Sequence, residues 1–535
     1  MAKAPSPATA TPSPTLYRPS ANIPLQSVEV PYFDLFRART ASELSGYFNT
    51  VFWTQRVLQE CHFEPAIRHA AVALGALYKA LEQVVVSSRA DMAMPHRHWQ
   101  VAVRQYSEAC KVMMLLDDQS QHSNRTRLMA SVLLSSFDAF IGDHKQAIVQ
   151  IRSGLGLLDR LRVEQARSGS PEPVEEEFIA IFTRLFIQAK SYDMAFHFPE
   201  PYVIRLDSTD ASVPGPERLF MSSSAVSLDV PFSTLQEARL AYDHLLEKSL
   251  GLIERMHLIQ KQPYPLFPAS WHQHGLGFQD ELRRWTQAFQ PLFEARLSPS
   301  NNLSPHERSG IAALQMLQLN SAILFRSLFN TAESQFDAFL PQFQEIVDLG
   351  YEIVPGNERL AAAERCSHPE ESCPHRPRNG PGNITDGGLV AHHIRPSFSS
   401  DLGIVAPLFV VITKCREPHT RRRAIRLLRS SARREGMWDS ELAARIGQWI
   451  MDLEESDGDE ASVDGMAHGT VGGGHAGIPY KWPPSKPIPE ERRVMVYSVD
   501  FDLRARFAHL QVGARAATAN PAETDPRRRE TYISW

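Results

Sequence analysis

The chain has 535 residues, a formal net charge of −5, 43% hydrophobic residues and 22% charged residues, which is ordinary for a soluble globular protein. The charge gives no overall reason to expect nucleic acid or an anionic membrane as a partner, and no apolar run approaches the ~20 residues of a membrane-spanning helix. Five scattered cysteines fit a reducing compartment rather than a disulfide framework.

The first 32 residues are rich in Pro, Ser, Ala and Thr and lack the apolar centre of a secretory signal, so we expect a disordered tail. A helix is predicted after Pro65, a residue whose missing N–H is not needed in the first turn. Apolar residues recur at helical spacing from Ile67 to Leu81, and the small residues around Gly75 would let a neighbouring element approach closely.

Helical patterns continue along the chain, and a Gly142-Asp143 turn is expected between two of the helices. The run 404–412 fits a buried core segment, and 494–499 fits a strand or an extended strip. These patterns predict an all-α protein, an irregular multi-helix assembly. Its expected parts are a tail at 1–32, a single large helical domain at 33–510, flexible inserts at about 355–399 and 456–489, and a polar C-terminal tail at 511–535.

Several phrases carry a resemblance to a known family, and they occur in a fixed order. They are the Phe52-Trp53 pair, EPAIRHAAVALGALY (64–78), LLSSFDAFIGDHKQAIVQIRSGLGLLDRL (133–161), EEEFIAIFTRLFIQAKSYDMAF (175–196), FSTLQEARLAYDHLL (232–246), KCREPHTRRRAIRLLRSSARREGMWDSELAARIGQWIMDLEE (414–455) and VYSVDFDLRARFA (496–508). Together they resemble the regulatory region of fungal zinc-cluster transcription factors, most closely the regulators found beside secondary-metabolite gene clusters.

The resemblance implies control of transcription in the nucleus, through contacts with other transcription regulators or co-regulators and through homo- or heterodimers. The family's DNA-binding module needs six closely spaced cysteines to hold two zinc ions. This sequence has five, none within its first 60 residues and no two spaced C-x-x-C. We therefore expect no zinc cluster in this polypeptide, no direct sequence-specific DNA binding, no cofactor and no membrane contact.

One set of residues has the chemistry of a metal site, namely Cys366, His368, Cys373 and His375. Neither half has the C-x2-C or H-x3-H spacing of most structural zinc sites, and Pro and Glu surround them. The pattern favours a chance cluster in a solvated loop over a metal site.

Two arginine clusters are candidates for nuclear import or phosphate contact: Arg421, Arg422 and Arg423, and Arg527, Arg528 and Arg529. In the first cluster apolar residues alternate with the arginines at helical spacing. This favours an amphipathic helix whose arginines are either solvated or paired with acidic neighbours. The second cluster lies in the predicted tail and is the better import candidate.

Enzyme motifs are absent: there is no G-x-S-x-G, H-E-x-x-H or phosphate-cradling loop, and Asp117-Asp118 lacks the third carboxylate of a DDxxD magnesium site. Asp138, Asp143 and His144 are better explained by the turn than by catalysis. We expect a transcription regulator and no enzyme. The alternatives are a non-activating scaffold or competitor of full-length factors, a truncated gene model of a DNA-binding factor, and, least favoured, an all-α enzyme.

Overall fold

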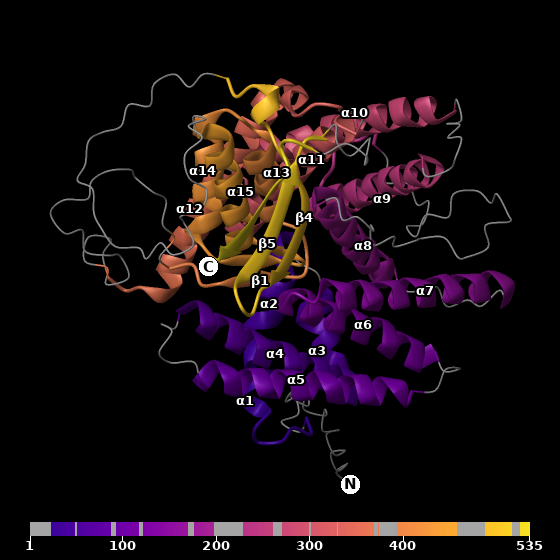
Figure 1. Ribbon diagram of the computed structural model, residues 1–535. Coiled ribbons are helices and arrows are strands. Elements are labelled where there is room, and N and C mark those ends of the chain that lie inside the picture. The colour runs from indigo at the N-terminus through magenta and orange to yellow at the C-terminus, as the bar shows by residue number, and fades with distance from the viewer. Residues whose placement is uncertain are drawn as a thin grey trace, which may run out of the picture.

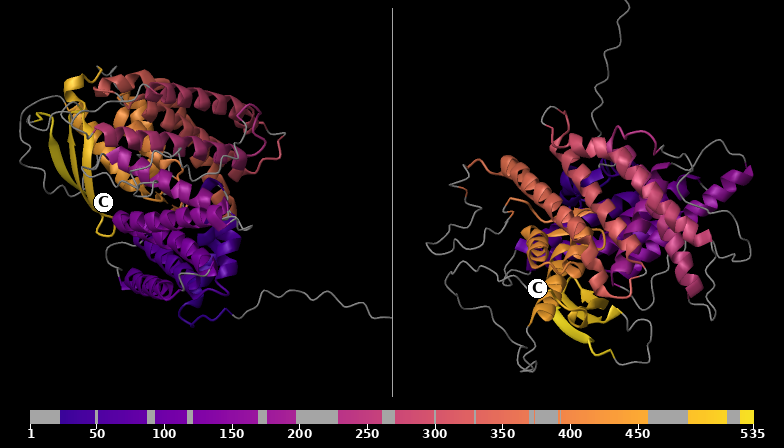
Figure 2. Two further views of the ribbon diagram at one scale, coloured as in Figure 1. Left: turned by 90° about the vertical axis from the view of Figure 1, so that its right-hand side faces the viewer. Right: turned by 90° about the horizontal axis from the view of Figure 1, so that it is seen from above.

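The computed structural model describes residues 23–48, 51–86, 93–116, 121–168, 176–196, 228–260, 270–298, 301–328, 330–368, 373, 391, 393–456, 487–515 and 525–535. Helices dominate these residues and strands are few and short, so the predicted all-α multi-helix assembly is confirmed. The helices form a lower and an upper group, with a small sheet along one side (Figures 1 and 2).

The lower group contains the elements from the N-terminal part of the chain (Figure 1). They are α1 (Val30–Leu35), η1 (Phe36–Thr40), α2 (Ala41–Leu44), η2 (Gly46–Phe48), η3 (Phe52–Arg56), α3 (Val57–Glu60), α4 (Pro65–Val86), α5 (Ala93–Met114), α6 (Gln121–Ile141) and α7 (His144–Ser168). The helix predicted after Pro65 is α4. A Cβ at Gly75 would lie 2.2 Å from the Tyr32 carbonyl oxygen, so the small residue lets α1 lie directly on α4.

The expected Gly-Asp turn joins α6 to α7. Gly142 has φ +90°, a left-handed conformation that favours glycine. The Asp143 carboxylate accepts the backbone N–H of Gln146 at 3.0 Å, which satisfies one open donor in the first turn of α7. The turn is confirmed.

The upper group is built around a short apolar helix. Its members are α8 (Glu176–Phe196), α9 (Leu235–Gln260), α10 (Ser270–Ala295), α11 (Pro305–Arg326), η4 (Glu333–Phe339), α12 (Leu340–Arg365), α13 (Val405–Lys414), α14 (Pro418–Ser430), α15 (Ser440–Glu455) and η6 (Glu490–Arg492). Every residue of α13 from Val405 to Thr413 is buried, and α11, α12, α14 and α15 contact it. The apolar run 404–412 is therefore a core segment, as predicted, and none of the described helices is long and apolar enough to cross a membrane.

Among the described residues, two three-stranded sheets complete the fold. β1 (Ser397–Ser399) pairs in parallel with β2 (Arg433–Glu435), which pairs antiparallel with β3 (Trp438–Asp439). β4 (Met495–Asp502), β5 (Phe507–Gly513) and β6 (Arg529–Ser534) form an antiparallel meander on the flank of the upper helices (Figure 2), where β4 contacts α8.

Three predicted boundaries differ from the structure. α1 begins at Val30, inside the predicted tail, and α12 continues past Pro355 to Arg365, so the first insert begins later than predicted. β6 lies in the predicted C-terminal tail, where Tyr532 stacks on His509 of β5 with ring centroids 4.7 Å apart. Cross-strand stacking of this kind stabilises an otherwise polar edge strand. The second predicted insert falls mostly on 457–486, outside the described residues.

Candidate functional site

The basic motif between Lys414 and Arg434 lies largely inside the protein. Arg421 is fully buried in α14, where it donates one hydrogen bond to the Ile412 carbonyl at 2.8 Å and another to Glu454 at 2.8 Å. Arg416 donates to Glu454 at 2.7 Å and to Glu333 at 3.0 Å. The charge of these arginines is thus balanced by buried acids of η4 and α15.

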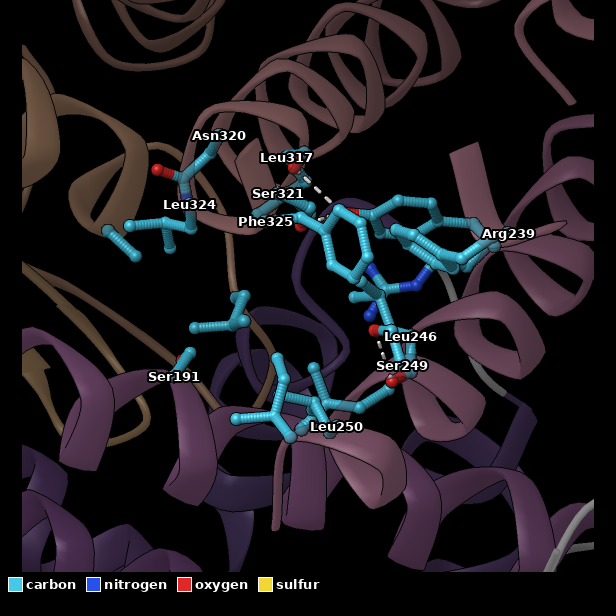
Figure 3. A pocket seen from close by; sticks show the side chains of 16 residues that line it. Ser191, Arg239, Leu246, Ser249, Leu250, Leu317, Asn320, Ser321, Leu324 and Phe325 are labelled. Atoms are coloured by element: carbon cyan, nitrogen blue, oxygen red, sulfur yellow. Dashed lines mark hydrogen bonds between the residues drawn. The ribbon is translucent and has the colours of Figure 1, made fainter. Parts of the chain in front are cut away.

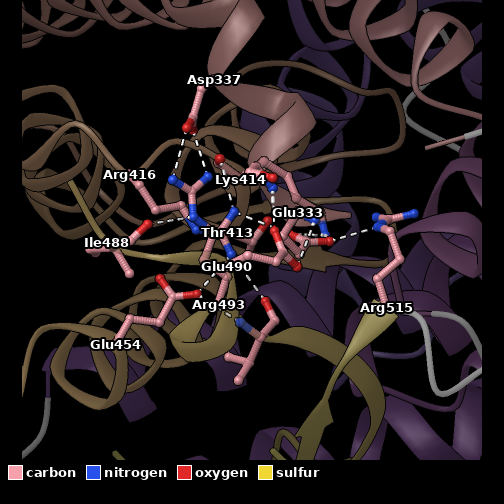
Figure 4. A network of polar contacts seen from close by, with 12 residues as sticks. Glu333, Asp337, Thr413, Lys414, Arg416, Glu454, Ile488, Glu490, Arg493 and Arg515 are labelled. Carbon is pink, nitrogen blue, oxygen red and sulfur yellow. Dashed lines mark hydrogen bonds and ion pairs between the residues drawn. The ribbon is translucent and has the colours of Figure 1, made fainter. Parts of the chain in front are cut away.

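Glu333 is the centre of this ionic network (Figure 4). Its carboxylate, fully shielded from solvent, accepts from Lys414 at 2.9 Å, Arg416 at 3.0 Å and Arg515 at 2.8 Å. Burial by itself raises the pKa of Glu333, but the three cations outweigh it and lower the pKa to about 2. The network joins η4 to the end of α13 and to the residues that follow β5.

The predicted arginine sites differ in exposure. The burial of Arg421 argues against phosphate contact there, because its guanidinium has no path to solvent. Arg422 pairs with Glu455, and Arg423 pairs with Asp348 at 2.8 Å; both arginines are partly exposed, and their role in import or phosphate binding stays a prediction.

The second arginine cluster is more accessible. Arg527 is half-buried and donates to Glu490 at 3.2 Å, whereas Arg528 and Arg529 are exposed at the start of β6. An import role there stays a prediction.

The segment Arg-Glu-Gly-x-Trp-Asp, residues 434–439, has a structural explanation. Arg434 pairs with Asp439 at 2.9 Å, and Asp439 also accepts a backbone N–H at the start of α15. The buried Glu435 carboxylate accepts three backbone N–H groups at the start of α13, at 2.8, 3.0 and 3.1 Å, which suits the positive end of a helix. Gly436 has φ +57°, and a Cβ there would collide with Gln188. The segment therefore joins two helix starts through one tight turn.

Near the α6–α7 turn, Asp138 and His144 are buried, whereas Asp143 is exposed. Burial raises the pKa of Asp138 to about 8, and Tyr106 donates a hydrogen bond to it at 3.1 Å. Burial lowers the pKa of His144 to about 3, and its ring packs against Tyr192 and Phe501. Both pKa shifts favour the uncharged form, which suits two side chains buried in the core. Asp117 and Asp118 lie outside the described residues.

A cavity of about 740 Å³ lies where the lower and upper helix groups meet. Its walls come from α4, α5, α14, α15, the β1–β3 sheet, the β4–β5 turn and the C-terminal residue. Apolar and aromatic residues form part of its surface, among them Leu81, Trp99, Ile141, Ile394, Phe398, Leu503 and Trp535. This size is within the range, about 300–1,000 Å³, of pockets that hold small molecules.

The cavity is rich in positive charge. Six arginines line it against two acids: Arg429, Arg433, Arg434, Arg445, Arg504 and Arg506 against Asp439 and Glu441. The acids pair with Arg434 and with Arg445, the latter at 2.8 Å. Buried Arg433 donates to the Tyr47 hydroxyl at 3.0 Å, while its second terminal nitrogen has no hydrogen-bond partner. The Arg504 guanidinium lies 4.8 Å from the centre of the Trp99 ring.

This arrangement can hold an organic anion. Apolar walls remove the body of such a ligand from water, and guanidinium groups bind carboxylates or phosphates through paired hydrogen bonds. No spacing in the sequence predicted this cavity, because its lining comes from segments as distant as Ala80 and Trp535.

A second crevice, shown in Figure 3, is far smaller at about 50 Å³. It lies between α9 and α11, where the Tyr242 hydroxyl donates to the Leu317 carbonyl at 2.7 Å. A space of that size holds little more than a water molecule or two, so the arginine-rich cavity is the better candidate site.

The structure brings together part of the candidate metal set. Cys366 and Cys373 have their sulfur atoms 3.4 Å apart, and His368 Nδ1 lies 3.8 Å from the Cys366 sulfur. His375 lies outside the described residues. The residue that sequence reasoning missed is His393, whose Nε2 lies 3.1 Å from the Cys373 sulfur. A Pro- and Gly-rich stretch separates Cys373 from His393, and no common spacing of zinc ligands includes such a stretch. No sequence signal could therefore have identified His393 as a ligand.

Comparison with known proteins gives one informative match. No protein-family model and no solved structure matches the chain. The chain is 22% identical over 512 residues to the aspercryptin biosynthesis cluster-specific transcription regulator atnN of Emericella nidulans, covering 84% of this chain and 75% of the relative. Over most of its length, the chain is thus similar to a fungal cluster-specific transcription regulator, which supports a role in transcription regulation.

Proposed function

We propose that this protein is a nuclear transcription regulator of a secondary-metabolite biosynthetic gene cluster, that it acts through contacts with other regulators, and that it has no catalytic activity. The observation that carries the proposal is the match to a cluster-specific regulator along 84% of the chain. A match of that extent covers most of the chain, rather than one shared motif.

Two features support protein contacts rather than DNA contacts. The chain has five cysteines, which is one short of a binuclear zinc cluster. The most arginine-rich helix, α14, uses Arg421 inside the core and pairs Arg422 and Arg423 with acids. Few arginines of α14 therefore remain available to contact DNA phosphates and release their counterions.

A tethering experiment tests the proposal. The chain is fused to a foreign DNA-binding domain, and expression of a matching reporter is compared with that of the DNA-binding domain alone. We expect activation from the fusion. An inactive fusion that suppresses a full-length relative would favour the alternative of a competitor.

DNA binding is tested separately with the purified chain and labelled promoter fragments at moderate salt. We expect no difference between a cluster promoter and a shuffled fragment of the same length. A tight, sequence-dependent shift would contradict the proposal that this polypeptide acts without reading bases.

A second role, response to a small-molecule anion, is favoured by the arginine-rich cavity. Arg504, which lines the cavity and stacks on Trp99, is the residue we assign to ligand recognition. A screen of aromatic and aliphatic carboxylates by thermal shift tests this role. We expect a hit whose stabilisation is lost in Arg504→Ala and kept in the surface variant Arg283→Ala.

A further inference from the structure

Two cysteines and a histidine converge where α12 ends. Cys366 directly follows the last helical residue, and Cys373 and His393 come from the insert that leads to β1. The Cys366 and Cys373 sulfurs are 3.4 Å apart, the Cys373 sulfur is 3.1 Å from His393 Nε2, and all three ligand atoms lie within 4.8 Å of one another.

These separations are close to those around a tetrahedral zinc ion. With Zn–S bonds of about 2.3 Å and Zn–N bonds of about 2.05 Å, two sulfurs lie about 3.8 Å apart and a sulfur and a nitrogen about 3.6 Å apart. The S–S separation of 3.4 Å and the Cys373–His393 separation of 3.1 Å are shorter by a few tenths of an ångström, so a small movement of the side chains would admit the ion. We propose that Cys366, Cys373 and His393 bind a structural zinc ion, and that His368 turns toward these three residues to become the fourth ligand.

The orientation of His393 supports this site. Its Nδ1 donates to the Glu358 carboxylate at 2.6 Å, and the same carboxylate accepts the backbone N–H groups of His393 and Ile394 at 3.0 and 3.1 Å. Since Nδ1 carries the donated proton, the Nε2 lone pair faces the Cys373 sulfur. A carboxylate behind the imidazole is the arrangement that orients histidine ligands in zinc proteins.

Burial and charge are also suitable. Cys373 and His393 are buried and Cys366 is half-buried, so an ion there would be shielded from solvent. Two thiolates neutralise one Zn²⁺, which avoids a net charge in the interior. Two thiolates with imidazole favour zinc over magnesium or calcium, both of which prefer oxygen ligands.

His368 is a candidate for the fourth position, because its Nδ1 lies 3.8 Å from the Cys366 sulfur, near the ~3.6 Å expected for two ligands of one zinc ion. It is not among the residues whose ligand atoms all lie within 4.8 Å of one another, so its side chain must move toward Cys373 and His393 when the ion binds. His368 is exposed, and it follows Cys366 by two residues, so both come from the end of α12.

The ion would connect the insert to the wall of the arginine-rich cavity. Ala391 and Ile394, on either side of His393, both line that cavity. Binding would close the chain between Cys366 and His393 into a loop and hold this wall against α12. Structural zinc of this kind contributes to folding free energy, because the ligand set is not preformed in the unfolded chain.

The first test uses the full chain, purified under reducing conditions and loaded with Co²⁺ as a spectroscopic substitute. We expect one equivalent of cobalt, tetrahedral visible absorption, near-ultraviolet thiolate-to-metal charge transfer, and displacement of the cobalt by Zn²⁺. Absence of the charge-transfer band, or binding too weak to survive gel filtration, would overturn the proposal. A Cys366–Cys373 disulfide, detected by mass spectrometry in the protein purified under reducing conditions, would also overturn it.

Variants assign the ligands. Cys373→Ser and His393→Gln should lose the metal, whereas Cys110→Ser, a change at a half-buried cysteine outside this group, should keep one equivalent. Circular dichroism establishes that each variant is folded. Glu358→Gln should weaken zinc binding 10- to 100-fold in competition with a chelator. His368→Gln should weaken it as well, and unchanged affinity would refute His368 as the fourth ligand.

Discussion

Replacing Glu333 by Gln removes one negative charge from the middle of three buried cations. The carboxylate is fully buried and lies 2.8–3.0 Å from Lys414, Arg416 and Arg515. Because its pKa is lowered to about 2, the ionised form is favoured in the folded protein by a few kcal/mol, at about 1.36 kcal/mol per pKa unit. Breaking a buried ion pair by removing one partner costs about 3–5 kcal/mol, which is the same order.

The assay is urea unfolding of wild type and Glu333→Gln at pH 7 and pH 4. A group whose folded pKa is lowered stabilises the protein above its unfolded pKa, and this contribution is lost as pH falls toward the folded pKa. The difference in unfolding free energy should therefore be a few kcal/mol at pH 7 and smaller at pH 4, where part of the unfolded chain already has this carboxyl protonated.

The matched control is Asp280→Asn, which removes an exposed carboxylate paired with Arg283 one turn away. That change should cost less than about 0.5 kcal/mol, as exposed ion pairs usually do. A loss below about 1 kcal/mol in Glu333→Gln, or a loss that does not shrink at pH 4, would refute the proposed ionic core.

Three further changes test other parts of the account. Burial raises the pKa of Asp138 to about 8, so its contribution to stability is complete below about pH 4 and is lost progressively by about pH 8. Asp138→Asn should therefore raise the melting temperature by an amount that grows between pH 5 and 8 and then levels off, and a pH-independent difference would contradict this. Gly154→Ala in α7 should destabilise the protein by about 1–3 kcal/mol, because the new Cβ would lie 2.1 Å from the Phe182 ring. Gly156→Ala, where a Cβ would have no neighbour within 4 Å, should instead stabilise the protein by up to about 1 kcal/mol. Equal effects of the two changes in urea unfolding would refute the packing of Gly154 against Phe182. Arg504→Ala should abolish the thermal shift by any carboxylate that binds the cavity while leaving the circular dichroism spectrum unchanged, and a retained shift would remove Arg504 from the recognition site.

Local patterns predicted several elements well. α4 and α13 have apolar residues that must be buried wherever their neighbours lie, and Gly142 takes a backbone conformation that suits glycine best. Such features depend on residues adjacent in sequence, so a single sequence is sufficient to predict them.

Features that depend on distant pairing were not predictable in this way. The arginines of α14 look solvent-exposed from their spacing, but Glu454 lies 33 residues from Arg421 along the chain and makes its burial possible. Likewise β6 has little apolar character of its own and is ordered by its pairing with β5, and His393 meets Cys373 only after the chain returns from the insert.

Activation from a tethered position tests the central claim most directly. Fused to a foreign DNA-binding domain, the chain should raise reporter expression above that of the DNA-binding domain alone, and Glu333→Gln should reduce the gain because it weakens the core that holds α13 and α15 together. Reporter expression equal to that of the DNA-binding domain alone, with the fusion folded and present in the nucleus, would contradict the claim.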